Sequence, residues 1–200
     1  MTRDESLDAL MATARAEFLR HGFDGTDVNR IARRSGMAPN SVYRWFKDKS
    51  DIFVAVYRRW EAEEQAAMRR LMARSGPLAA LVEDCVDHHR GHPLFRRSLR
   101  RLGHDDARVR QALAVSRLER LAGLKRLMGE PCANDADLAV DLLLFESLAI
   151  VLAEADLAEM GLDDKDARRQ LGAILARWRA RPVRAANDLV AESRRGAGPI

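Results

Sequence analysis

The chain has 200 residues, of which 47% are hydrophobic and 32% charged, and its formal net charge is +4. This apolar fraction is large enough for a buried core, which argues against a disordered chain. The longest apolar segment, residues 138–152, is interrupted by Asp141 and Glu146, so we expect no membrane-spanning helix. With no apolar signal region at the N-terminus and two isolated cysteines, Cys85 and Cys132, we expect a cytoplasmic protein without a disulfide framework.

Basic residues are concentrated between residues 26 and 60. This stretch contains eight Lys and Arg against three Asp, an excess larger than that of the whole chain. A local cationic segment beside a near-neutral remainder indicates a polyanionic partner at this segment.

Two short helices are predicted to open the chain. Apolar side chains recur at helical spacing over residues 7–21, and Gly22 suits the end of that helix. A second helix is expected to begin at Thr26, whose hydroxyl can accept a hydrogen bond from a first-turn amide. Ile31 belongs to its buried face, and Gly36 ends it.

A third helix is predicted over residues 39–46, with Pro39 at its first position. The short glycine-containing connection from the second helix makes the pair a helix-turn-helix. Val42 and Phe46 are four residues apart and are expected to face inward. The side chains left facing outward are those of Asn40, Ser41, Tyr43 and Arg44.

The outward side chains have the chemistry that recognises DNA. Arginine can bind guanine through two hydrogen bonds and asparagine can bind adenine in the same way, whereas serine and tyrosine hydroxyls suit phosphate oxygens. A fourth helix is expected to begin at Asp48, where Lys49 and the free first-turn amides can together bind a phosphate. We therefore interpret the N-terminal segment as a DNA-binding head.

Three runs of sequence make this interpretation more specific. They are FLRHGFDGT at 18–26, IARRSGMA at 31–38 and SVYRWFKDK at 41–49, and their order and spacing resemble the TetR family of regulators. Ala38 departs from the family pattern, which usually has a capping Ser or Thr there. The resemblance implies phosphate contacts from Thr26, Tyr43 and Lys49, and base contacts near Asn40, Ser41 and Arg44.

Glycine and proline divide the rest of the chain into further helices, without strand-like alternation. These helices are predicted over residues 47–74, 78–90, 94–102, 105–128, 135–160 and 164–180. The expected fold class is all-α, with a three-helix helix-turn-helix head at 1–50, a larger effector-binding and dimerisation domain at 51–182 and a flexible tail at 183–200. The helix 47–74 is expected to connect the two domains.

Residues 138–152 are apolar on nearly every side, and such a helix has to be covered on every side. The last predicted helix offers a partner stripe of Leu171, Ile174, Leu175 and Trp178. We expect these two helices to form a four-helix interface with a two-fold copy, because two recognition helices about 34 Å apart can read successive major grooves. An ordinary monomer core is the alternative. Within the apolar helix, we expect Asp141 and Glu146 to pair with Arg168, Arg169 or Arg177, or Glu146 to face a ligand.

The resemblance also implies a small-molecule pocket in the C-terminal domain. In the family, ligand binding there moves the fourth helix and spreads the two heads. We expect the pocket walls to come from the helices that contain Cys85, Phe95, Leu118 and Phe145.

Two clusters allow other interpretations. Cys85, His88, His89 and His92 fall at helical spacing and could hold a metal ion, although Gly91 and Pro93 are expected to end the helix near His92. A second cluster is a basic run that could neutralise an acidic effector or extra phosphates, or be a solvated face balanced by Asp105 and Asp106. The run consists of Arg96, Arg97, Arg100, Arg101 and His104.

These patterns predict a dimeric DNA-binding transcriptional regulator. The resemblance to the TetR family implies that it is a repressor that acts at a palindromic operator and is released by a ligand. Its partners would be operator DNA, an unidentified small molecule and a second copy of the chain, with no membrane. No catalytic constellation is recognisable, so we expect neither enzyme activity nor a cofactor. Two alternatives stay open: a DNA-binding adaptor regulated by a protein partner, and a metal sensor or all-α metalloenzyme that uses the cysteine–histidine cluster.

Overall fold

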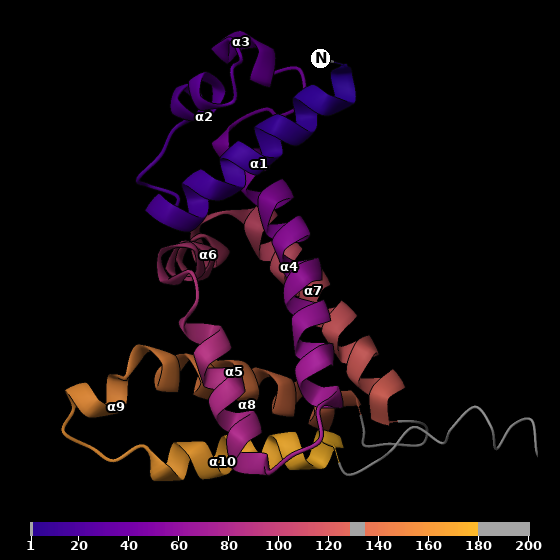
Figure 1. Cartoon of the computed structure of the whole chain (residues 1–200), viewed down its shortest axis with the longest axis vertical. Helices are drawn as coiled ribbons and strands as arrows, with labels where there is room; N and C mark the ends of the chain where they lie inside the picture. Colours follow the sequence, from indigo (N-terminus) through magenta and orange to yellow (C-terminus); the bar gives the residue numbers. More distant parts are fainter. Residues whose placement is uncertain (1, 129–134, 180–200) are drawn as a thin grey trace, which may run out of the picture. The chain divides into compact units, whose positions relative to one another are not determined.

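The computed structural model describes residues 2–128 and 135–179, and within these ranges the chain is helical without strands. The all-α prediction is therefore confirmed (Figure 1). The helices are α1 (Arg3–His21), α2 (Val28–Arg34), α3 (Pro39–Val42), α4 (Lys49–Ala73), α5 (Leu78–Arg90), α6 (Pro93–Asp105), α7 (Ala107–Met128), α8 (Asp135–Glu154), α9 (Asp156–Glu159) and α10 (Lys165–Arg179).

Most helix ends fall within three residues of their predicted positions because glycine and proline mark them. The main difference is at Ala155, whose φ of 60° breaks the single predicted helix 135–160 into α8 and α9. The predicted tail at 183–200 and Cys132 lie outside the described residues.

The chain packs as two compact units. Of the described residues, the first unit contains those up to Arg70 together with His88–Leu118, and the second contains Leu71–Asp87 and those from Glu119 to Arg179. Residue 50 is therefore not a packing boundary, because α6 and the first part of α7 belong to the same unit as the N-terminal helices. The division of function at residue 50 remains a prediction.

Aromatic rings from three helices form the centre of the first unit. The centroid of the Phe53 ring on α4 lies 5.1 Å from that of Phe18 on α1 and 5.0 Å from that of Phe95 on α6. Trp60 lies about two turns further along α4, and the centroid of its ring is 5.2 Å from that of Phe95. Such pairs add about 0.5–1.5 kcal/mol each beyond the burial of their area, so α1, α4 and α6 are held as one body.

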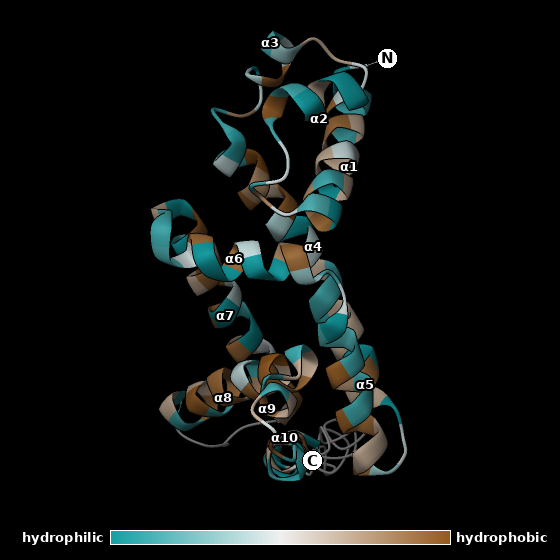
Figure 2. Cartoon of the chain, turned by 90° about the vertical axis from the view of Figure 1, so that its left-hand side faces the viewer, coloured by the Kyte–Doolittle hydropathy of each residue, from teal (hydrophilic) through white to brown (hydrophobic). Residues whose placement is uncertain are grey.

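The second unit is built on the packing of α8 against α10. Phe145 and Trp178 contact each other with ring centroids 5.1 Å apart, and Arg177 forms two hydrogen bonds of 2.9 and 2.5 Å with Asp141. α8 is hydrophobic along most of its length (Figure 2), yet no helix of the described chain is long and apolar enough to cross a membrane.

Candidate nucleic-acid interface

The start of α2 differs from the sequence prediction. Asp27, and not Thr26, caps the helix, since its Oδ1 accepts a hydrogen bond of 2.8 Å from the Arg30 amide. Thr26 is buried, and its hydroxyl donates to Glu17 Oε2 at 3.1 Å. The predicted cap was wrong because the Thr26 hydroxyl is hydrogen-bonded to the buried carboxylate of Glu17, nine residues earlier in the chain.

Glu17 joins α1 to α2 from inside the head. Its carboxylate also accepts from Arg34 and lies 2.7 Å from Nε of Arg30. Burial alone would raise the pKa of Glu17, but hydrogen bonds from Thr26 and Arg34 and the charges of Arg30 and Arg34 outweigh it and hold that pKa below its ordinary value. Glu17 is therefore ionised at neutral pH, and it forms ion pairs with two arginines of α2, Arg30 and Arg34.

The recognition segment, residues 39–46, contains a helix shorter than predicted. α3 covers only Pro39–Val42, and the chain then continues through hydrogen-bonded turns in which the amides of Trp45 and Phe46 donate to the Val42 carbonyl. Ala38 precedes the helix and provides no side-chain cap. Without that cap, little stabilises a longer helix here.

The recognition segment nevertheless presents its polar side chains to solvent. Val42 is fully buried, whereas Asn40 and Arg44 are exposed and Tyr43 is 54% exposed. Ser41 is half-buried. Within the part of the chain that the structure describes, the side chains of Asn40, Tyr43 and Arg44 have no polar partner, so all three can reach an external ligand.

Lys49 is engaged within the head. Its Nζ donates to the carbonyl oxygens of Phe23 at 2.9 Å and of Thr26 at 3.1 Å. Two of the three N–H donors of this ammonium are therefore used inside the head, which leaves one for a phosphate.

Two other cations flank the recognition segment and were not singled out from the sequence. Arg33 lies near the end of α2 and Lys47 follows the segment directly, and both are exposed. Neither side chain has an acidic partner among residues 2–128 and 135–179. The structure is needed to see that these two charges can bind an external anion, because the sequence does not reveal which of the neighbouring carboxylates are already paired.

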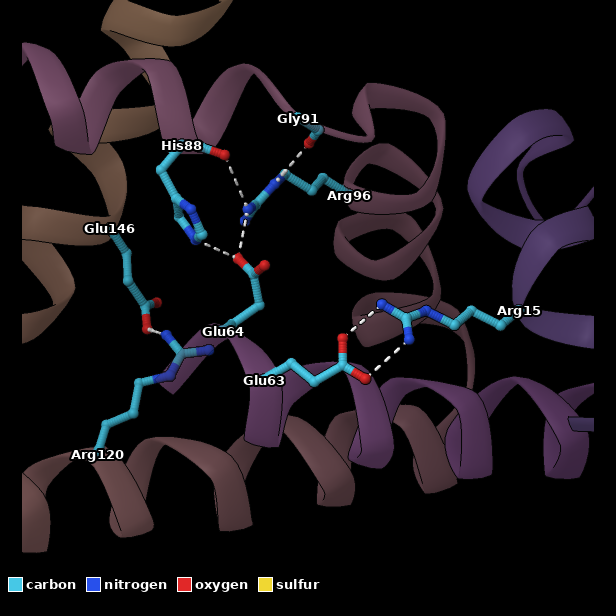
Figure 3. Close-up of polar contacts among 8 residues, drawn as sticks. All are labelled: Arg15, Glu63, Glu64, His88, Gly91, Arg96, Arg120 and Glu146. Carbon is cyan, nitrogen blue, oxygen red and sulfur yellow. Dashed lines mark hydrogen bonds and ion pairs between the residues drawn. The ribbon is translucent and has the colours of Figure 1, made fainter. Parts of the chain in front are cut away.

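The proposed metal cluster does not form. Cys85 is fully buried, and burial together with the charge of Asp84 raises the pKa of its thiol to about 12. His88 contacts Glu64 Oε2 at 2.6 Å (Figure 3), and His92 lies beyond the end of α5 with a φ of 58°. Across the described ranges, no group of three His, Cys, Asp or Glu residues could hold a metal ion.

The basic run on α6 is partly used for internal contacts. Arg96 donates to the Gly91 carbonyl at 2.9 Å and to Glu64 at 2.6 Å (Figure 3). Arg101 binds Asp24 at 2.6 Å. Arg101 also pairs with Asp105 and is exposed, as is Arg97, so the run serves both as a solvated face and as a set of internal contacts.

The residues predicted to line an effector pocket are divided between the two units. Phe95 and Leu118 belong to the first unit, and Cys85 and Phe145 to the second. Phe95, Cys85 and Phe145 are buried, whereas Leu118 is exposed. Neither unit by itself brings all four together.

The predicted dimer stripe is core in this chain. Leu171, Ile174, Leu175 and Trp178 are all buried within the second unit. Gly172 lies on the same face, and a β-carbon there would approach Val82 Cγ2 of α5 to 3.5 Å. The prediction that these side chains face a second copy was wrong, because α5 and α8 already cover them. Glu146 pairs with Arg120 of α7 (Figure 3), not with an α10 arginine. Asp141 pairs with Arg177, one of the expected arginines, but does so within the same chain.

Comparison with known proteins identifies the N-terminal segment. Residues 10–56 match the family described as "Bacterial regulatory proteins, tetR family". The chain is 30% identical over 92 residues to the HTH-type transcriptional repressor AcnR of Corynebacterium diphtheriae, a match that covers 46% of this chain and 44% of AcnR. AcnR of Corynebacterium glutamicum is 28% identical over 71 residues, 36% of each chain. The matched stretch thus spans less than half the length of either relative.

Solved structures share the fold over most of the chain. A TetR-family transcriptional regulator from Streptomyces coelicolor superimposes with a TM-score of 0.58 at 21% identity, covering 96% of this chain and 97% of that one. FadR from Bacillus subtilis, solved in complex with stearoyl-CoA, gives a TM-score of 0.55 at 13% identity and covers 86% and 97%.

Proposed function

We propose that this chain, whose residues 10–56 match the TetR family of bacterial regulatory proteins, is a member of that family: a dimeric transcriptional repressor that binds a palindromic operator and is released by a small molecule. The family assignment and the repressor relatives support the DNA-binding part of this proposal.

One observation carries the DNA-binding function. The recognition segment buries Val42 and leaves Asn40, Tyr43 and Arg44 exposed without internal polar partners among the described residues. These three side chains offer an amide, a phenol and a guanidinium, which are groups that bind base edges and phosphates in the major groove. The proposed roles are base contacts from Asn40, Ser41 and Arg44 and a phosphate contact from Tyr43.

A second copy of the chain is the proposed occupant of the outer face of α8. Val140 is 54% exposed, Leu143 44% and Leu144 48%, and they recur at the spacing of one helical face. Exposed aliphatic side chains in a row on one helix are typical of a protein interface. Dimerisation through this face would give the two recognition segments that a palindrome requires.

The effector is proposed to be a small molecule bound outside the DNA-binding head. FadR of Bacillus subtilis has the same fold and was solved with stearoyl-CoA, which supports a ligand-responsive role for this architecture.

The experiment that tests the function is selection of bound duplexes from a random pool by the purified full chain. We expect enrichment of one palindrome with half-sites about 10 base pairs apart. A Tyr43→Ala/Arg44→Ala variant should lose the enrichment, and Arg169→Ala in α10 is the control that should keep it. A wild-type chain that enriches no sequence above the input pool contradicts the proposal.

A further inference from the structure

We propose that the α6–α7 corner positions the recognition segment, with Arg108 as the positioning residue that holds the first turn of α4. This inference rests on the proposed DNA-binding function and adds residues to it that do not themselves contact DNA.

The corner binds the chain where it leaves the recognition segment. Arg108 Nη1 donates to Asp48 Oδ2 at 3.0 Å, and the side chain of Ser50 is hydrogen-bonded to Asp106. The carboxylate of Asp106 also accepts from the Arg108 amide at 2.9 Å, which fixes the first turn of α7. Two residues of the corner therefore hold two residues at the start of α4.

The contacts continue from Asp48 into the recognition segment. Asp48 Oδ1 accepts from the Asp51 amide at 2.9 Å, and Asp51 Oδ2 accepts from the Lys47 amide at 3.0 Å. Lys47 follows Phe46, the last residue of the segment. An unbroken series of polar contacts thus runs from Arg108 to the backbone next to the segment.

The same part of the molecule binds the chain where it enters the helix-turn-helix. The Phe23 amide donates to Ser98 Oγ on α6 at 2.8 Å, and Arg101 binds Asp24 at 2.6 Å. A β-carbon at Gly22 would lie 3.0 Å from Ser98 Oγ, so the backbone approaches α6 closely here. The helix-turn-helix is therefore held at both of its ends by residues 98–108.

The recognition segment needs such external support. α3 has four residues and no side-chain cap, so its own hydrogen bonds fix its orientation poorly. The side chains of Arg108 and Asp48 are 44% and 50% exposed, and exposed pairs add little to global stability. The pair can therefore be removed without unfolding the unit, which makes its effect on DNA binding measurable.

The test is a double-mutant cycle on operator affinity. Arg108→Ala and Asp48→Asn should each lower operator affinity by about 2- to 30-fold, the range expected when a coupling residue is changed. Asparagine has one acceptor oxygen, so Asp48→Asn can keep the bond from the Asp51 amide while it removes the charge and the second oxygen, which accepts from Arg108. The double variant should bind no worse than either single variant. Arg126→Ala, an exposed position near the other end of α7, is the control that should bind like wild type.

The salt dependence separates positioning from direct contact. A residue that binds a phosphate lowers the slope of log affinity against log salt by about 0.9 when removed, whereas a positioning residue leaves that slope unchanged. The inference would be overturned if Arg108→Ala or Asp48→Asn bound the operator with normal affinity, or if the losses of the two single variants added up in the double variant. It would also be overturned if either variant had a salt slope reduced by one phosphate contact. Failure of wild type to select an operator would instead overturn the proposed function.

Discussion

The ammonium group of Lys49 lies 3.9 Å from the centre of the Phe23 ring and donates a hydrogen bond of 2.9 Å to the carbonyl oxygen of the same residue. The first residue of α4 is thereby bound to the connection between α1 and α2. The Lys49 side chain therefore connects the residue that follows the helix-turn-helix to the segment that precedes it.

Replacement of Lys49 by Met is expected to destabilise the head. The variant loses two charge-assisted hydrogen bonds and a cation–π contact, which should lower the free energy of unfolding by about 1.5–3 kcal/mol. Urea unfolding followed by circular dichroism measures this loss. Because the ammonium already makes two hydrogen bonds within the head, we expect the salt slope of DNA binding to stay unchanged. A slope reduced by about 0.9 would instead support a phosphate contact from Lys49.

Lys47→Met should behave in the opposite way. Its side chain is exposed and has no acidic partner in the described part of the chain, so unfolding should be unaffected. We expect the variant to weaken binding to all duplexes and to lower the salt slope by about 0.9, and Arg33→Ala to do the same. Titrations at several salt concentrations check this, and an unchanged slope in both variants would exclude these residues from the phosphate contacts.

Arg44→Ala should relax sequence preference at one base position. Loss of a two-bond contact to guanine costs about 1–3 kcal/mol of discrimination there, while non-specific affinity falls only slightly. Binding of the variant to operators substituted one base pair at a time identifies the position. If the variant discriminates between base pairs as well as wild type at every position, Arg44 reads no base.

Glu64→Gln should reduce stability at neutral pH more than at acid pH. Burial alone would raise the pKa of Glu64, but hydrogen bonds and charge from His88 and Arg96 lower it below 4.5. A carboxyl whose pKa is lowered by folding stabilises the protein above its unfolded pKa, and this contribution disappears as the pH falls through the folded pKa.

We therefore expect Glu64→Gln to cost about 1–3 kcal/mol at pH 7 and much less at a pH below the folded pKa of Glu64. Urea unfolding at both pH values measures the difference. Glu63→Gln is the matched control, because the neighbouring Glu63 is 55% exposed in its pair with Arg15 (Figure 3) and exposed pairs contribute about 0–1 kcal/mol. A pH-independent loss in Glu64→Gln would refute the charge argument.

Leu143→Glu should dissociate the proposed dimer without unfolding the chain. Its side chain is 44% exposed on α8, so a carboxylate is tolerated in the monomer but not in an apolar interface. Sedimentation velocity should show a monomer with a normal helical spectrum. Leu171→Glu, in contrast, should unfold the second unit, because Leu171 is fully buried. If the Leu143→Glu variant is still a dimer, the interface lies elsewhere.

The helices, their ends and the exposed side of the recognition segment could be predicted from the sequence. Gly22, Gly36 and Pro39 mark ends through local backbone chemistry, and the burial of Val42 follows from helical spacing alone. These features depend on residues close together in the chain, which is why periodicity and capping rules suffice for them.

Contacts between distant residues could not be predicted. The burial of Thr26 depends on the Glu17 carboxylate, and the position of the Lys49 ammonium depends on two carbonyls more than twenty residues away. The apolar stripe of α10 posed a related problem. Spacing showed that Leu171 and Leu175 need a partner, but it could not distinguish cover by α8 of the same chain from cover by a second copy.

The burial of Cys85 has a consequence for oxidative chemistry. Peroxides and electrophiles attack the thiolate, and a thiol with a pKa of about 12 that is shielded from solvent supplies almost none at neutral pH. Sulfenic acid formation and alkylation at this position are therefore expected to be very slow while the second unit stays folded. Cys85 is thus poorly suited to act as a redox sensor for the regulator.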